Sequence, residues 1–252
     1  MNENISSIAR KLLNAEKAVI FTGAGISTES GIPDYRSKGG LWDRYRPIYF
    51  DEFMSSKEAR AEYWRRKAAF YPELLKAKPN PAHLAVTELC KKGRIHTVIT
   101  QNVDGLHQES GLPDDRIIEL HGNTRRVRCM SCGKTGSIHD AQKRVAAGEE
   151  APECACGGYL KPDTISFGQS MPVEALERAI GLSKNCDFFM VVGSTLLVQP
   201  AAGLPFHAME NGAFMAVVNL SETPLDNRCD VLIREKAGEV LPMIVKAVNE
   251  IN

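Results

Sequence analysis

The sequence predicts an α/β protein with a mostly parallel, doubly wound sheet and two inserted modules. Short apolar runs alternate with stretches of helical periodicity, which is the pattern of a parallel sheet covered by helices on both faces. A glycine turn follows the first apolar run, and two close pairs of cysteines lie near the middle of the 252-residue chain. These three observations give the fold class and the positions of the candidate functional segments.

The main α/β domain is predicted from residues 1–36, 79–123 and 161–252. It begins with a helix at 4–16, where apolar residues recur near helical spacing, and a buried strand at 18–21. The other expected strands are short apolar runs at 97–100, 117–120, 188–192 and 216–220. Helical stretches are expected at about 81–92, 173–183 and 201–211. This alternation predicts that successive strands run parallel.

Two segments differ from this domain in composition. Residues 37–78 carry many aromatic and charged side chains and end at the turn Lys78-Pro79-Asn80-Pro81, which indicates a small helical module. Residues 124–160 have few large apolar side chains, several glycines and the paired cysteines. We expect this second segment to be held together by a metal ion.

The paired cysteines form Cys-x-x-Cys at Cys129 and Cys132 and Cys-x-Cys at Cys154 and Cys156. Four thiolates fill a tetrahedral Zn²⁺ site completely, so the ion is expected to be structural. Free or redox-active thiols are the alternative. The other three cysteines stand alone and are expected to be small buried apolar residues, at Cys90, Cys186 and Cys229.

Composition and charge exclude several classes of protein. Lys+Arg and Asp+Glu both total 31, so the formal net charge is zero and bulk attraction to nucleic acid or to anionic membranes is not expected. The N-terminal residues lack the apolar core of a signal peptide, and no uncharged apolar run reaches the ~20 residues that a membrane helix needs. We therefore expect a cytoplasmic protein.

The glycine turn lies in the segment FTGAGISTESGIPDYRS, residues 21–37. Gly23 and Gly25 let the backbone approach a phosphate, and the N–H groups of a helix start at 26–28 can bind the anion. In a dehydrogenase, a helix and a second strand with an acidic end would follow. Gly31 and Pro33 interrupt such a helix here, and the cluster Asp34-Tyr35-Arg36 follows. This pattern favours a dinucleotide that is consumed, although a tight structural turn remains the alternative.

Two polar segments follow predicted strands at the edge where open α/β sheets bind ligands. In Thr100-Gln101-Asn102-Val103-Asp104, amides and a carboxylate suit a carboxamide ring and a ribose, although Asp104 could simply cap a helix. His121 follows the next strand beside a glycine and could act as a general base, although a lone histidine is more often structural.

Two further segments follow apolar strands at the same edge. Hydroxyl groups and backbone amides there could hold the adenosine ribose and a phosphate, at Gly193, Ser194, Thr195, Asn219 and Leu220. Each of these motifs is weak alone, and their repetition at one sheet edge is the evidence.

Together these motifs resemble the sirtuin family, the NAD-dependent protein lysine deacylases, in its bacterial type. The resemblance rests on ordered motifs over nearly the whole chain: GAGISTESGIPDYRS, KPNPAH, TQNVDGLH, ELHGN, the cysteine pairs, FGQSMP, GSTLLVQPAA and VNLSETP. It implies a Rossmann-like NAD-binding domain with a helical module and a zinc-ribbon module. It also implies NAD as co-substrate and one structural Zn²⁺ ion.

The resemblance implies a role for each candidate residue. His121 and Asn102 would be catalytic. The cofactor would contact Gly23, Ala24, Gly25, Thr28, Asp34, Tyr35, Arg36, Gln101, Asn102, Asp104, Gly193, Ser194, Thr195, Asn219, Leu220 and Ala237. An acyl-lysine peptide would enter as an added strand beside Phe167, Gly168 and Val198.

The implied reaction consumes NAD. The acyl oxygen would attack the ribose carbon that bears nicotinamide, and His121 would then act as general base on the ribose hydroxyls. Water would finally release lysine and O-acyl-ADP-ribose. Residues 26–40 would act as a lid that excludes water until that step.

Four positions bear on selectivity. Many sirtuins have Phe where this chain has Tyr35, and many have Glu where it has Gln169. Members that remove succinyl or malonyl groups carry Tyr-x-x-Arg in the helical module. Tyr63 and Arg66 have that spacing, but plain deacetylation is the leading expectation.

Two other functions remain open from the sequence. An NAD-dependent protein ADP-ribosyltransferase would use the same NAD site. A zinc-ribbon interaction module would bind nucleic acid or protein, but the zero net charge argues against it. We expect acyl-lysine proteins or peptides as partners, no membrane association, and a monomer.

Overall fold

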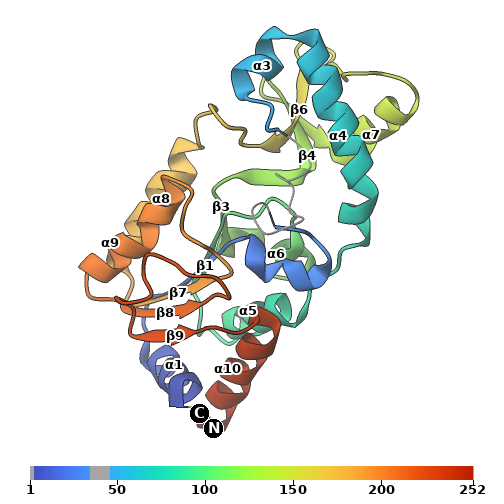
Figure 1. Ribbon diagram of the computed structural model, residues 1–252. Coiled ribbons are helices and arrows are strands. Elements are labelled where there is room, and N and C mark those ends of the chain that lie inside the picture. The colour runs from blue at the N-terminus through green and yellow to red at the C-terminus, as the bar shows by residue number, and fades with distance from the viewer. Residues whose placement is uncertain (1–2, 35–45, 252) are drawn as a thin grey trace.

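A computed structural model describes residues 3–34 and 46–251 of the chain. Figure 1 shows a large lobe built around the parallel sheet and a small lobe that carries α3, α4, α7, β4 and β6. The chain passes between the lobes several times, so both are made of discontinuous segments. Among the described residues, no helix combines the length and the apolar character that crossing a membrane requires.

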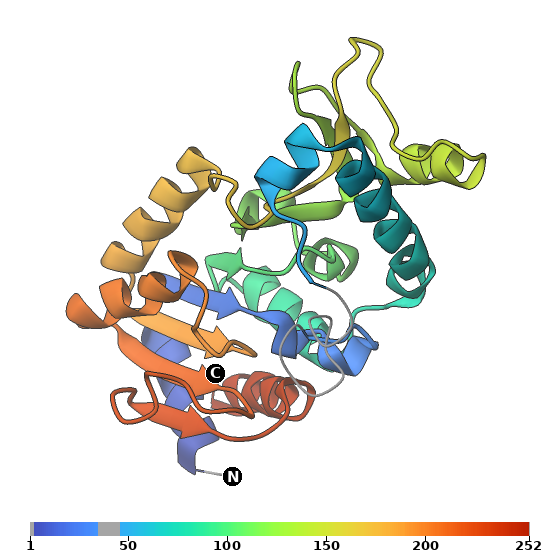
Figure 2. The ribbon, with the colours of Figure 1, turned by 45° about the horizontal axis from the view of Figure 1, so that its top comes forward.

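The main sheet confirms the predicted fold class. Within the described residues it has six strands, all parallel, in the order β3-β2-β1-β7-β8-β9. These strands are β1 (Ala18–Thr22), β2 (Thr97–Thr100), β3 (Ile117–Glu119), β7 (Phe188–Val192), β8 (Phe214–Val218) and β9 (Val231–Ile233). The order reverses between β1 and β7, and such a switch point opens a crevice at the carboxyl ends of the strands. Figure 2 shows these arrows pointing the same way.

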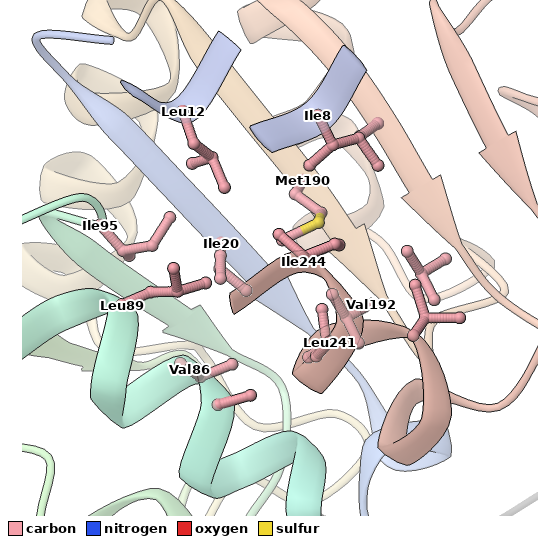
Figure 3. Close-up of a cluster of buried hydrophobic side chains, with 14 of the residues drawn as sticks. Ile8, Leu12, Ile20, Val86, Leu89, Ile95, Met190, Val192, Leu241 and Ile244 are labelled. Carbon is pink, nitrogen blue, oxygen red and sulfur yellow. The ribbon is translucent and has the colours of Figure 1, made fainter. Parts of the chain in front are cut away.

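Helices cover both faces of the sheet. One face packs against α1 (Glu3–Asn14), α5 (Pro81–Lys91) and α10 (Ala237–Ile251). The other packs against α8 (Val173–Asn185) and α9 (Leu204–Glu210). Figure 3 shows the first core, where side chains of the helices meet the strand residues Ile20, Met190 and Val192. Burying each large aliphatic side chain of this kind contributes about 1.5–3 kcal/mol.

The small lobe combines two segments that are distant in sequence. The first supplies α3 (Phe50–Ser55) and α4 (Lys57–Lys76). The second supplies β4 (Gly122–Cys129), β5 (Thr135–Ser137), α7 (Ile138–Ala146) and β6 (Leu160–Thr164), with an antiparallel sheet in the order β5-β4-β6. The fully buried Trp64 of α4 joins them, because its indole N–H donates to the carbonyl of Leu160 at 3.1 Å.

Helix starts follow from local capping. The side chain of Asn80 accepts a hydrogen bond from the backbone N–H of Ala82 at 2.9 Å, and Pro81 occupies the first position of α5. Such a cap satisfies a helix donor that would otherwise lack a partner. This local sequence fixes the start of α5 and also places the His83 ring 3.5 Å from the Ser27 hydroxyl.

Some predicted elements were wrong in detail. The segment after Gly23 forms two short 3₁₀ turns, η1 (Ala24–Ile26) and η2 (Thr28–Ser30), where a helix start at 26–28 was expected. The strand expected at 216–220 lies two residues earlier, at Phe214–Val218. Strand β9 and helix α10 were not predicted. The remaining short elements are α6 (Leu106–Glu109), η3 (Asp114–Arg116) and η4 (Ala201–Gly203).

Candidate active site

A cavity of about 400 Å³ lies at the carboxyl edge of the main sheet, and we call it the first cavity. Its walls come from the loops after β1, β2, β3, β7, β8 and β9. The sequence-predicted residues that line it are Gly23, Ala24, Gly25, Thr28, Asp34, Gln101, Asn102, His121, Gly193, Ser194, Thr195, Val198, Asn219, Leu220 and Ala237. The fold therefore gathers in one place residues that are spread over most of the sequence.

The glycines of the first cavity bring two loops into backbone contact. The Gly25 N–H donates to the carbonyl of Gly193 at 2.8 Å. Gly193 has φ of 63°, and a Cβ there would lie 2.3 Å from the backbone nitrogen of Ile26. A Cβ on Gly25 would lie 2.8 Å from the Gly193 Cα. Side chains are therefore excluded at these positions, which leaves the backbone open to a close-lying ligand.

Asn102 and Asp104 meet through a serine that the sequence analysis did not select. The Ser27 hydroxyl donates to the Asp104 carboxylate at 2.7 Å and accepts from the side-chain amide of Asn102 at 3.1 Å. Ser27 is 1% exposed, so its hydroxyl has a structural role in placing both side chains. Its position in the GAGIS motif, directly after the glycine turn, was the available signal.

A second cavity of about 110 Å³ adjoins the first and shares Ala24 and Asn102 with it. Asp104 lines this second cavity and does not line the first. The far wall comes from the small lobe, and most of its side chains are apolar or aromatic. The lining residues from that lobe are Lys67, Phe70, Tyr71, Leu74, Thr124, Ile138, Gln142 and Pro162. The site therefore lies between the two lobes.

His121 is held in the form that a general base requires. Its Nδ1 lies 3.0 Å from the carbonyl of Gln101. A carbonyl can only accept, so Nδ1 carries the proton and Nε2 keeps its lone pair. Burial lowers the pKa of His121 from its ordinary value of 6.5, and the hydrogen bond to Gln101 raises it only in part. The ring is therefore neutral at pH 7.

The far end of the first cavity is organised by two groups that the sequence analysis missed. Arg234 donates to the carbonyls of Asn219 and Ser221 and pairs with Asp226, which shapes the loop after β8. Glu29 accepts a hydrogen bond from the backbone N–H of Gly238 at 2.8 Å, which joins the glycine turn to the start of α10. Long-range contacts of this kind leave no local pattern in a sequence.

The predicted peptide-binding residues lie in different surroundings. Phe167 is 41% exposed, and its ring centroid lies 5.9 Å from that of Tyr49. Val198 lines the first cavity, whereas Phe167 and Gly168 stand outside the lining of both cavities. The side-chain carbonyl of Gln169 accepts from the backbone N–H of Ser166 at 3.2 Å, so this amide has an internal partner.

Tyr63 and Arg66 do not line either cavity. The guanidinium of Arg66 pairs with Glu62 at 2.6 Å and donates to the carbonyl of Arg46 at 2.6 Å. Tyr63 is 9% exposed, and its hydroxyl lies 3.5 Å from that of Thr164. Both side chains are therefore engaged within the small lobe, although their spacing matches the acidic-acyl motif.

The four paired cysteines converge as predicted. The Sγ atoms of Cys129, Cys132, Cys154 and Cys156 all lie within 4.8 Å of one another. The Cys129–Cys156 and Cys132–Cys154 distances are 3.6 and 3.8 Å. Tetrahedral Zn–S bonds of about 2.3 Å require sulfurs about 3.8 Å apart, so the cluster fits zinc. Of the other cysteines, Cys186 is buried, and Cys90 and Cys229 are partly buried.

Two predicted cofactor residues, Tyr35 and Arg36, lie outside the described residues. Their predicted roles therefore stay predictions, and so does the predicted lid at 26–40, of which residues 35–40 also lie outside the described residues. The neighbouring Asp34 is described and lines the first cavity.

Comparison with known proteins agrees with this geometry. Residues 23–200 match the Sir2 family. The chain is 45% identical over 242 residues to the NAD-dependent protein deacetylase of Rhodopseudomonas palustris, covering 96% of each chain. It is 42% identical over 253 residues to the NAD-dependent protein deacylase of Pyrococcus abyssi, covering 98% of this chain and 99% of that protein.

Solved structures show the same fold. A Sir2 protein with a p53 peptide and NAD⁺ is 35% identical, with a TM-score of 0.87 and coverage of 98% of both chains. A Sir2 variant with a deacetylated p53 peptide and 3′-O-acetyl ADP ribose is 36% identical, with a TM-score of 0.88 and coverage of 96% of this chain and 97% of that one. With the matched region spanning most of its length, the chain belongs to the Sir2 family, the sirtuins.

Proposed function

We propose that His121 is the general base of this chain, which is an NAD-dependent protein lysine deacylase. The observation that carries this role is the neutral His121 ring, whose Nδ1 is fixed by Gln101 while the ring lines the first cavity beside Asn102. A buried neutral imidazole with a free Nε2 lone pair can take a proton from a ribose hydroxyl at neutral pH.

NAD would lie along the first cavity as co-substrate. The close backbone approach at Gly23, Gly25 and Gly193 suits its pyrophosphate. Thr28, Ser194 and Thr195 border the same part of the cavity, and Asn219, Leu220 and Ala237 border the adenosine end. Asn102 and Asp104, linked through Ser27, would hold the nicotinamide end where the two cavities meet.

The acyl oxygen of the substrate would displace nicotinamide from the ribose carbon. The proton on a ribose hydroxyl would then move to Nε2 of His121, and the oxygen would attack the acyl carbon. Addition of water would complete transfer of the acyl group to ADP-ribose and free the lysine. The apolar wall of the second cavity would help to exclude water before that step.

The second substrate would be an acyl-lysine protein or peptide. One solved relative is described as Sir2 bound to acetylated peptide. Here the peptide would lie as an added strand beside Phe167, Gly168 and Val198. Acetyl-lysine is the leading substrate, because the only cation that the acidic-acyl motif supplies, Arg66, is paired with Glu62.

We also propose a cytoplasmic monomer without direct nucleic-acid binding. Support comes from the lack of any disulfide among the described cysteines and from the formal net charge of zero. We propose that the chain has the three parts predicted from its sequence. These are an NAD-binding domain at 1–36, 79–123 and 161–252, a helical module at 37–78, and a zinc-binding module at 124–160.

The test is incubation of the purified protein with NAD and an acetyl-lysine peptide. Nicotinamide and deacetylated peptide should appear in equal amounts, and neither should form without NAD. Deacetylation that proceeds equally well without NAD would refute the proposal. A stable mass gain of one ADP-ribose on the acceptor would instead indicate the ADP-ribosyltransferase alternative.

A further inference from the structure

Two buried histidines are linked to Asn102 through hydrogen bonds of Ser27, Thr22 and Thr100. His83 of α5 is 0% exposed, and His107 of α6 is 2% exposed. Their rings meet edge to face with centroids 5.1 Å apart. Burial lowers the pKa of His107 to about 3 and that of His83 to about 4, so both rings are neutral at pH 7. Neither ring lines the first or the second cavity, and the proposed mechanism uses neither.

His107 is connected to the backbone of Asn102 through two threonines. The Thr22 hydroxyl donates to the Thr100 hydroxyl at 2.8 Å, and the backbone N–H of Asn102 donates to the same Thr100 oxygen at 3.0 Å. The Nε2 of His107 lies 3.0 Å from the Thr22 hydroxyl. Thr22 and Thr100 are 0% and 3% exposed, so this chain of contacts is shielded from solvent.

The direction of each hydrogen bond in this chain follows from proton counting. The single hydroxyl proton of Thr22 goes to Thr100, so Nε2 of His107 must donate to Thr22. His107 is therefore the Nε2–H tautomer, and its Nδ1 is a buried acceptor without a partner among the described residues. The ring thus holds Thr22 in the orientation in which that residue donates onward.

His83 is connected to the side chain of Asn102 through Ser27. The Ser27 hydroxyl donates its only proton to Asp104, so the Nε2 of His83, at 3.5 Å from that hydroxyl, can only donate to it. Ser27 in turn accepts from the Asn102 side chain. The backbone N–H and the side-chain amide of Asn102 therefore each donate to a hydroxyl oxygen. The two histidines determine in which direction those hydroxyl groups donate their own protons.

We infer that His107 is a positioning residue for NAD cleavage, acting through Thr22 and Thr100 on the backbone of Asn102. The inference deepens the proposed function, since it rests on Asn102 contacting the co-substrate. Loss of the Nε2 donor would free the Thr22 hydroxyl to rotate, remove the fixed acceptor from the Asn102 N–H, and loosen the nicotinamide end of the site. The peptide groove, at Phe167 and Val198, would be unaffected.

The test compares His107→Leu with His107→Gln. The Gln side-chain amide places an N–H near the position of Nε2, whereas Leu fills the space without a donor. We expect His107→Leu to lower kcat/KM for NAD by about tenfold, as the loss of a buried hydrogen bond allows. The KM for the acetyl-lysine peptide should stay within about twofold. His107→Gln should retain most of the wild-type kcat/KM for NAD.

Two further variants separate positioning from stability. Ser183→Ala removes another buried hydrogen bond, from the Ser183 hydroxyl to the carbonyl of Ala179 at 2.8 Å within α8, which has no part in the chain to Asn102. It should lower the Tm as His107→Leu does but leave kcat/KM for NAD unchanged. Thr22→Val breaks the same chain as His107→Leu, so the double variant should lose little more than either single one.

Several outcomes would overturn the inference: equal effects of His107→Leu and Ser183→Ala on NAD kinetics, equal loss in the Leu and Gln variants, or additive losses with Thr22→Val. Wild-type protein is assayed alongside. A wild type without NAD-dependent turnover would refute the proposed function, whereas an active wild type with these outcomes would refute only the role of His107.

Discussion

At the scale of single residues, one hydrogen bond sets both the tautomer and the orientation of His121. The acceptor is the backbone carbonyl of Gln101, which no side-chain substitution removes. Burial at the end of β3 acts in the same sense, because it lowers the pKa and keeps the ring neutral. The ring that we propose as the general base is therefore kept neutral and oriented by the fold around it.

Replacing His121 with Ala should abolish proton transfer without removing the NAD site. We expect turnover to fall by about 10²–10⁴-fold, the usual contribution of a general base. NAD affinity, measured by calorimetry, should change much less, because the backbone contacts at Gly25 and Gly193 remain. Full activity in His121→Ala would remove this residue from its proposed role.

The pH dependence of kcat/KM reports the same group. Because the pKa of His121 is lowered from 6.5, the base stays unprotonated down to pH values below 6.5. Activity should therefore be present above the lowered pKa and be lost as the pH falls through it. An initial-rate series from pH 8 to pH 5 checks this. An acidic limb centred above 6.5 would contradict the environment described for the ring.

At the scale of elements, the contact between the loops after β1 and β7 depends on glycine. Gly193→Ala would place a Cβ 2.3 Å from the nitrogen of Ile26. Gly212 offers a matched control, with φ of 82° and no atom within 4 Å of a Cβ built there. A left-handed backbone costs each alanine about 1–2 kcal/mol. Any difference in stability between the two variants therefore reports the steric clash at residue 193.

We expect Gly193→Ala to raise the KM for NAD strongly and to lower the Tm more than Gly212→Ala does. Gly212→Ala should leave the kinetics unchanged, because Gly212 lies in the turn between α9 and β8, away from both cavities. Thermal unfolding and NAD titration measure the two effects separately. Similar NAD kinetics in the two variants would show that the close approach of these loops is not needed for binding.

We expect zinc bound by the four paired cysteines to stabilise the elements that form the far wall of the second cavity. Strand β4 carries Cys129, and helix α7 carries Ile138 and Gln142, which line that cavity. Removing zinc with a chelator, or by Cys132→Ser, should loosen this wall, lower the Tm and reduce turnover. Metal analysis should find about one zinc per chain. An unchanged Tm in the metal-free protein would show that the cluster does not stabilise the lobe.

At the scale of the whole molecule, the buried histidines link stability to pH. Their pKa values of about 3 and about 4 in the folded chain compare with 6.5 for an ordinary histidine. Between these values the unfolded chain binds more protons, so stability is present above about pH 6.5 and is lost as the pH falls. Carboxyl groups such as Asp163, with a pKa below its ordinary 3.8, stay ionised at pH 5.

Urea unfolding at pH 7 and pH 5 measures this linkage. Each histidine should contribute a loss of about 2 kcal/mol between the two pH values. His107→Gln removes one titrating group, so its stability should depend less on pH than that of the wild type by about that amount. An identical pH dependence in the two proteins would mean that His107 is accessible to protons in the folded state.

Sequence patterns predicted the features that depend on neighbours in the chain. The glycine turn, the Gln101–Asp104 loop and the cysteine pairs are contiguous, and parallel strands bring their ends to one edge of the sheet. Ser27, Glu29 and the wall of the second cavity depend on contacts between distant segments. Strand β9 has only three residues and helix α10 contains Pro242, so neither gives a clear periodic signal.

The interlocked small lobe has a consequence for protein engineering. Trp64 from one segment is buried against Val127 and Ile138 from the other, and both segments line the second cavity. Grafting residues 124–160 alone from another sirtuin would therefore place foreign side chains against a native α4. Chimeras intended to transfer acyl selectivity should exchange α3–α4 and β4–β6 together, because the side chains of the two segments share one packed core.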